Sequence, residues 1–253
     1  MLWDIGPYCM ISMDDAGKKP ARWLLWVIIV GLLWGQFVLL IGTVKNPTPN
    51  NLTTFSAIET AGLYTLLLFL TRRAWLPILA KRPAFRAIMF GIFNAALIEA
   101  EFWAFERFFG GSGIAASSNL LLDWLLTMPW YIGMVILFVR GQNRSRFTSV
   151  VLFLLCGLYE AGADGVVGGQ IMPWISGHGV PLLHAWSFLL FIAFWEFIPV
   201  YSSLILPAAW VIAAAPMPDP PPHRRWRDAL LPLAWLLPYT VYLVLVLIAI
   251  GHR

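Results

Sequence analysis

Residues 98–107 read IEAEFWAFER and place Glu99, Glu101 and Glu106 among aromatic side chains, within an otherwise apolar segment of helical length. A charged side chain at the centre of a membrane helix costs roughly 2.5–3.5 kcal/mol on insertion scales. Acids in such a segment are therefore neutralised, paired or turned towards a protein-lined cavity. This makes them candidates for function.

The composition of the whole chain is typical of a membrane protein. Of its 253 residues, 60% are hydrophobic and 12% are charged, and the mean hydropathy is +0.75, whereas about 25% of the residues in a soluble domain are charged. The basic residues are scattered between apolar runs, so the isoelectric point of about 9.3 does not indicate a nucleic-acid partner. The two cysteines, Cys9 and Cys156, match no disulfide or zinc motif.

The apolar runs predict an all-α integral membrane protein, a single bundle of about seven transmembrane helices, because each run is close to the roughly 20 residues that cross a bilayer. Residues 1–21 form a cytoplasmic N-terminal segment in this interpretation, and residues 22–251 form the membrane domain. Arg72 and Arg73 close the second span. The expected spans are residues 22–44, 55–71, 87–109, 119–139, 148–170, 181–206 and 230–250.

Lysine and arginine residues predict the orientation, because they accumulate in cytoplasmic loops. With seven spans, 14 of the 17 basic residues fall on one side, and only Lys45, Arg107 and Arg253 fall on the other. We therefore expect a cytoplasmic N-terminus and an external C-terminus. In a bacterium this multi-pass protein would lie in the plasma (inner) membrane.

Five acids inside the expected spans are the candidate catalytic residues. Glu99 and Glu160 lie near the midplane and rank first as proton donors, because a carboxyl group in a dry, aromatic environment keeps its proton. Glu101, Asp164 and Asp123 are expected as orienting or basic partners. Glu160 and Asp164 are four residues apart and project together, whereas Glu99 and Glu101 lie on nearly opposite faces of their helix.

Aromatic and polar residues at similar depths are the candidate substrate-binding groups. Asn94 shares a face with Glu101, so one face of the third span can line a cavity while the other bonds to a neighbouring helix. Asp123 continues into a polar and aromatic stripe with Thr127 and Trp130. The residues assigned to binding are Asn94, Trp103, Trp124, His184 and Trp186.

Buried acids and aromatic faces together suit acid-initiated isomerisation, hydration or cyclisation of an apolar lipid or isoprenoid, because aromatic rings stabilise cations. Membrane lipid and a lipidic small molecule are the expected partners. Two alternatives stay open. Intramembrane acids also serve proton-coupled transporters, in which glycine-rich segments such as residues 157–169 form discontinuous helices. A non-catalytic assembly or lipid-binding subunit is the other alternative.

No cofactor or metal is predicted from the motifs. HExxH, GxSxG and P-loop sequences are absent, and the seventh span has no lysine to form a retinal Schiff base. His184 is the one histidine within a span, which argues against bis-histidine haem. A carboxylate-rich metal site formed by Glu160, Asp164 and His184 is a lesser alternative.

Overall fold

The computed structural model describes residues 22–171, 193–215 and 226–251, and the part of the chain within these ranges contains helices and no strand. Six of the helices are long and apolar enough to cross a membrane. The chain is therefore a multi-pass, helical membrane protein. In chain order its elements are α1 (Arg22–Lys45), α2 (Pro49–Leu79), α3 (Pro83–Phe109), α4 (Leu120–Ser145), α5 (Ser149–Glu160), the π-helix η2 (Ala161–Ile171), α8 (Phe194–Glu196), α9 (Ile198–Ala213), α10 (Trp226–Leu230), the 3-10 helix η4 (Leu231–Trp235) and α11 (Leu236–Gly251).

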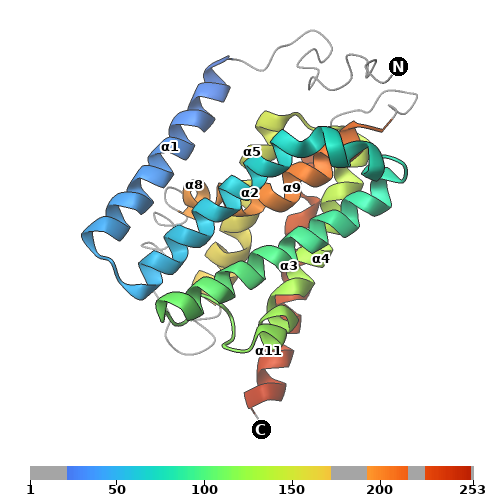
Figure 1. The fold of residues 1–253 in the computed structure, drawn as a ribbon. Coiled ribbons are helices and arrows are strands. Elements are labelled where there is room, and N and C mark those ends of the chain that lie inside the picture. The colour runs from blue at the N-terminus through green and yellow to red at the C-terminus, as the bar shows by residue number, and fades with distance from the viewer. Residues whose placement is uncertain (1–21, 172–192, 216–225, 252–253) are drawn as a thin grey trace.

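Helix α9 forms the centre of the bundle. It packs against α2, α3, α4 and α5, and almost every side chain from Ile198 to Ile212 is buried (Figure 1). Polar contacts join this apolar core as well: the Ser202 hydroxyl lies 3.3 Å from the Thr65 hydroxyl of α2. The polar residues Ser202 and Ser203 distinguish α9 from the lipid-exposed helix α1, because polar groups inside a membrane find their partners on neighbouring helices.

Helix α1 lies at the edge of the bundle and exposes most of its apolar side chains (Figure 1). Trp195 of α8 packs against Gly31 and Gly35, where an added Cβ would lie 2.5 Å and 2.9 Å from its side chain. Gln36 donates a hydrogen bond to the Glu196 carbonyl oxygen at 3.1 Å. Small residues allow this close approach of one helix to another in lipid.

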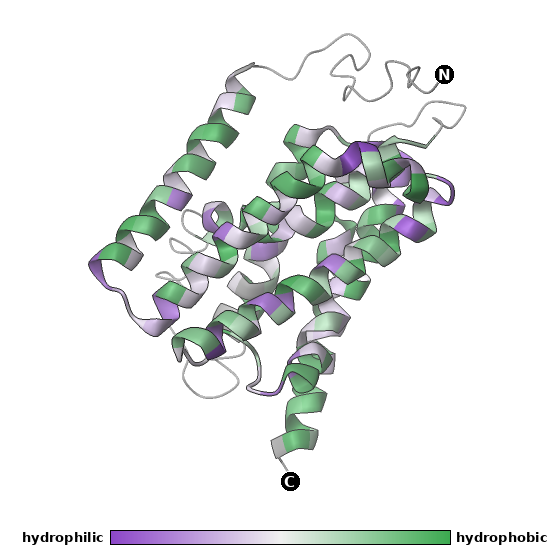
Figure 2. Cartoon of the chain, in the orientation of Figure 1, coloured by the Kyte–Doolittle hydropathy of each residue, from purple (hydrophilic) through white to green (hydrophobic). Residues whose placement is uncertain are grey.

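The two ends of the bundle differ in polarity. We call the end formed by residues 46–48 and 110–119 the loop end, where Asn50 and Ser112 exchange two hydrogen bonds between α2 and the α3–α4 connection. We call the end formed by residues 80–82 and 146–148 the basic end. Hydrophilic residues gather where α2 passes into α3, whereas α1 and α11 are largely hydrophobic (Figure 2).

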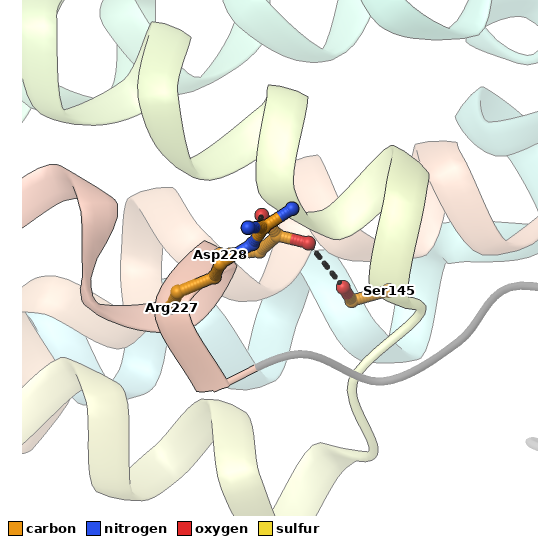
Figure 3. Close-up of polar contacts among 3 residues, drawn as sticks. All are labelled: Ser145, Arg227 and Asp228. Atoms are coloured by element: carbon orange, nitrogen blue, oxygen red, sulfur yellow. Dashed lines mark hydrogen bonds and ion pairs between the residues drawn. The ribbon is translucent and has the colours of Figure 1, made fainter.

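Asp228 fixes the start of the last helical segment to the basic end. The Ser145 hydroxyl at the end of α4 donates to Asp228 Oδ2 at 2.7 Å, and Arg227 Nε lies 4.0 Å from Oδ1 (Figure 3). Gly141 permits this contact, because an added Cβ would lie 2.4 Å from the Asp228 carbonyl oxygen. From here the chain runs through η4 and α11 towards the loop end, where the Tyr242 hydroxyl donates to the Leu125 carbonyl oxygen.

Six helices that could cross a membrane overlap six of the seven expected spans in order, whereas the described part of the expected span 181–206 overlaps the shorter helices α8 and α9. Helix α2 continues past Arg72 and Arg73 to Leu79. Its 31 residues make a helix about 46 Å long, which is longer than a hydrocarbon core of roughly 30 Å. Arg72 bonds to the Phe69 carbonyl oxygen and stacks on the Phe69 ring within the helix. Residues 1–21 and the first part of the expected span 181–206 lie outside the described residues.

Candidate functional site

A cavity of about 310 Å³ lies inside the bundle, towards the loop end. Glu99 of α3 and Glu160 of α5 both line it, although 61 positions separate them in the chain. The stripe expected on α4 also reaches the cavity through Thr127 and Trp130. The remaining lining residues are Thr54, Phe102, Gly113, Ile114, Ala115, Ala116, Tyr131, Ala163, Val167, Phe197, Val200, Tyr239 and Leu243.

Glu99 is held by Tyr131 of α4, whose hydroxyl donates to Glu99 Oε1 at 2.7 Å. A second acid of α4, Asp123, has an exposed fraction of 0% and interacts with Glu99. Two acids of neighbouring helices therefore lie close together beside the cavity.

The α3–α4 connection is attached to two acids, Glu106 of α3 and Asp123 of α4. Glu106, with an exposed fraction of 6%, accepts hydrogen bonds through Oε2 from the backbone N–H groups of Ile114 at 2.8 Å and Ala115 at 2.6 Å. Asp123 Oδ1 accepts from the N–H of Ser117 at 3.3 Å. Gly110 and Gly113 make the turns possible, because their φ angles of +73° and +79° are costly for other residues. The hydrogen bonds of these carboxyl groups thus hold the α3–α4 connection in place as one wall of the cavity.

Glu160 lines the cavity from another helix, at the point where the α-helix α5 becomes the π-helix η2. Its exposed fraction is 1%. Ala163 and Val167 on the following turns of η2 also line the cavity. π-Helical segments are rare and occur frequently at functional sites. Asp164 lies on η2, but its side chain is outside the described part of the structure, so its expected pairing with Glu160 stays a prediction.

Aromatic side chains form much of the remaining wall. Trp130 Nε1 donates to the Tyr201 hydroxyl at 2.8 Å, and the Trp130 and Tyr239 ring centroids are 5.9 Å apart. Tyr131 and Tyr201 are in contact at the same centroid separation, 5.9 Å. Tyr131 and Tyr239 were not among the expected site residues. The residues next to Tyr131 and Tyr239 in the sequence do not mark these two as cavity residues, because their position at the cavity depends on which helices pack together.

Residues on the other face of α3 contact neighbouring helices and do not line the cavity. Asn94 is fully buried; it accepts from the Tyr64 hydroxyl at 2.9 Å and donates to the Ser203 carbonyl oxygen at 3.0 Å. It therefore joins α2, α3 and α9 and does not line the cavity. Glu101 lies in a second hollow on the outer side of α2 and α3. The structure thus separates Glu101 from Glu99 and Glu160.

The expected tryptophans and histidine do not gather at the cavity within the described residues. Trp103 Nε1 donates to the Ser118 carbonyl oxygen at 3.0 Å, which attaches α3 to the α3–α4 connection. Trp124 lies next to Asp123 in the chain but is not part of the cavity wall. His184 and Trp186 lie outside the described residues, as does any metal site that would use His184. Within the described ranges, no group of three or more His, Cys, Asp or Glu residues is arranged to hold a metal ion.

Comparisons of the chain with protein-family models, with curated proteins and with solved structures give no match. The geometry of the cavity is therefore the basis on which we infer a function.

Proposed function

We propose that this chain is a seven-span membrane enzyme that transfers protons to and from an apolar lipid or isoprenoid inside the cavity. Its N-terminus is cytoplasmic and its C-terminus is external in this proposal. The observation that carries the proposal is the convergence of Glu99 and Glu160 on one aromatic cavity. Acid–base catalysis needs two such groups on either side of the reacting atoms.

The orientation is supported by the directions of the helices. Helices α1 and α3 end at the loop end, whereas α2 and α4 end at the basic end. Arg146, which follows α4, donates to the Ile212 carbonyl oxygen near the end of α9, so α9 also ends at the basic end. An odd number of crossings then brings α11 to the loop end. The basic end is the cytoplasmic side by the positive-inside rule.

Glu99 is suited to donate the proton, because it lines the aromatic cavity. It transfers its proton to one carbon of a substrate double bond and leaves a cation on the neighbouring carbon. The faces of Trp130, Phe102 and Tyr239 stabilise that cation through the ring quadrupole. The Tyr131 hydroxyl stabilises the carboxylate that remains on Glu99.

Glu160 ranks with Glu99 as a donor from the sequence alone; with Glu99 as the donor, we assign Glu160 the role of the base, which requires its ionised form when the substrate binds. Its carboxylate removes a proton from a carbon next to the cation, and the electron pair of that C–H bond forms the new double bond. The proton on Glu160 returns to Glu99 before the next turnover. The result is an isomerised lipid; attack on the cation by water or by a second double bond would instead give hydration or cyclisation. A volume of about 310 Å³ is at the lower limit for ligand sites, so the cavity accommodates the reacting end of a lipid.

The test is a comparison of membrane lipids by mass spectrometry between cells that express the wild-type protein and its variants at matched levels. Glu99→Gln and Glu160→Gln should each lower the amount of product at least about a hundredfold, because general acid–base groups contribute roughly 10²–10⁴. Glu59→Gln is the matched control, since this half-buried acid of α2 does not line the cavity. Full product formation in both cavity variants would exclude the proposed site.

Proton-coupled transport is the second candidate, and the backbone around the cavity is the observation that favours it. Both η2 and the break at Phe197 between α8 and α9 line the cavity, and irregular backbone of this kind is typical of transporter binding sites. If no lipid differs between wild type and variants, pH-dependent solute uptake into liposomes that depends on Glu160 would establish this function. The absence of both results would favour a non-catalytic subunit.

A further inference from the structure

A second hollow lies between α2 and α3 on their bilayer-facing side, with a volume of about 700 Å³. We call it the α2–α3 groove; Thr60 and Tyr64 line it from α2, and Ala100, Glu101, Ala104 and Phe108 line it from α3. Thr60, Ala104 and Phe108 are exposed, so the groove opens to the lipid. It is separate from the central cavity, because Glu99 and Glu101 project about 200° apart around α3.

Glu101 supplies the groove with one hydrogen-bond acceptor that the described residues leave unused. The Tyr64 hydroxyl, which also lines the groove, donates to Asn94 and not to Glu101. Glu101 Oε1 is buried and has no hydrogen-bond partner within the described part of the chain. The terminal torsion of a glutamate side chain is soft, so a small rotation turns this oxygen towards a ligand in the groove.

The depth of Glu101 restricts what can reach it. It lies eight residues before the end of α3 at Phe109, a rise of about 12 Å. That distance places it within the hydrocarbon region rather than at the headgroups. A phosphate or quaternary ammonium headgroup would have to be drawn out of water to this depth, at a large cost. The occupant therefore comes from the bilayer and is uncharged.

We propose that the α2–α3 groove binds a neutral lipid that carries a hydroxyl group, such as a long-chain or isoprenoid alcohol. A hydroxyl has one donor, which Glu101 Oε1 can accept, whereas an ammonium group brings three donors into a groove that is otherwise mostly apolar. The apolar chain lies along Ala100, Ala104 and Phe108. The volume of the groove is within the range of small-molecule sites.

The test uses the full-length protein in liposomes with two photoreactive probes. One is a long-chain alcohol with a diazirine and a terminal alkyne; the other is its methyl ether, which cannot donate a hydrogen bond. Mass spectrometry maps the labelled peptides. We expect the alcohol to label residues 60–64 and 97–108 about two- to tenfold more than the ether, which is the effect of one hydrogen bond.

Variants of Glu101 identify the acceptor. Glu101→Leu should abolish the preference for the alcohol, whereas Glu101→Gln should keep it, because the amide retains an acceptor oxygen. Glu59→Leu, which removes an acid of α2 that does not line the groove, should also keep it. Equal labelling by the two probes in wild type, or an unchanged preference in Glu101→Leu, would overturn the proposal. An unlabelled groove in a protein that is dimeric by native mass spectrometry would also overturn it, with a second copy as the occupant.

Discussion

Replacement of Glu106 by alanine should release the α3–α4 connection from the cavity. The Ile114 and Ala115 N–H groups both donate to Glu106 Oε2, and Glu106→Ala leaves them without this acceptor. Hydrogen bonds to a charged group contribute about 1.5–3 kcal/mol each. Water replaces part of this interaction because Gly113 and Ala116, which flank the two residues, are exposed, so we use the lower limit, about 3 kcal/mol for the two bonds.

That free energy corresponds to about a hundredfold change in the opening equilibrium, since 1.4 kcal/mol is a factor of ten. Amide hydrogen exchange measured by mass spectrometry on residues 110–119 reports this directly. We expect exchange at Ile114 and Ala115 to accelerate by about a hundredfold in Glu106→Ala and by less in Glu106→Gln, which keeps a neutral acceptor. Glu101→Ala is the control, because Glu101 faces the other side of α3. Unchanged exchange at both amides in Glu106→Ala would refute the reasoning.

Three further predictions concern packing and orientation. Asn94→Leu should lower the free energy of unfolding by about 1–3 kcal/mol, because it leaves the half-buried Tyr64 hydroxyl and the buried Ser203 carbonyl without this partner; thermal denaturation in detergent measures the loss, and an unchanged midpoint would contradict it. Gly141→Ala should cost about 1–3 kcal/mol through overpacking against Asp228, whereas Gly42→Ala, where no atom lies within 4 Å, should not lower the midpoint. Alkaline phosphatase fused to the C-terminus should be active in a bacterial host and inactive when fused after α4; the reverse pattern would invert the proposed orientation.

The course of the helices could be predicted from the sequence because lipid imposes one simple requirement. A membrane-spanning segment must satisfy its backbone internally, so a long apolar run becomes a helix. The position of a helix end follows a weaker rule. Arg72 and Arg73 are expected to mark the membrane boundary of the second span, whereas the helix itself continues through them to Leu79, because a helix can continue through basic residues outside the hydrocarbon core.

Part of the cavity wall, including Glu99 and Glu160, could be predicted from the sequence, but the separation of Glu101 from these two acids could not, because α3 carries acids on more than one face. Helical periodicity separates Glu99 from Glu101, but it does not say which of the two faces a partner. That depends on where α4, α5 and α9 pack, and these contacts join residues far apart in the chain, such as Glu99 and Glu160. The hydrogen bonds of Glu106 to the α3–α4 connection depend in addition on the backbone path set by Gly110 and Gly113.

The central position of α9 has a consequence for biosynthesis. The ribosome makes α2, α3, α4 and α5 before the helix around which they pack. The hydrogen bond between Asn94 and Ser203 can form only after 109 further residues have been synthesised. The one between Gln36 and Glu196 can form only after 160 further residues. At roughly 5–20 residues per second, the second interval is about 8–32 s. During this time the early helices lie in the bilayer without the hydrogen bonds that α8 and α9 supply, so assembly can be completed only once synthesis of the chain is almost finished.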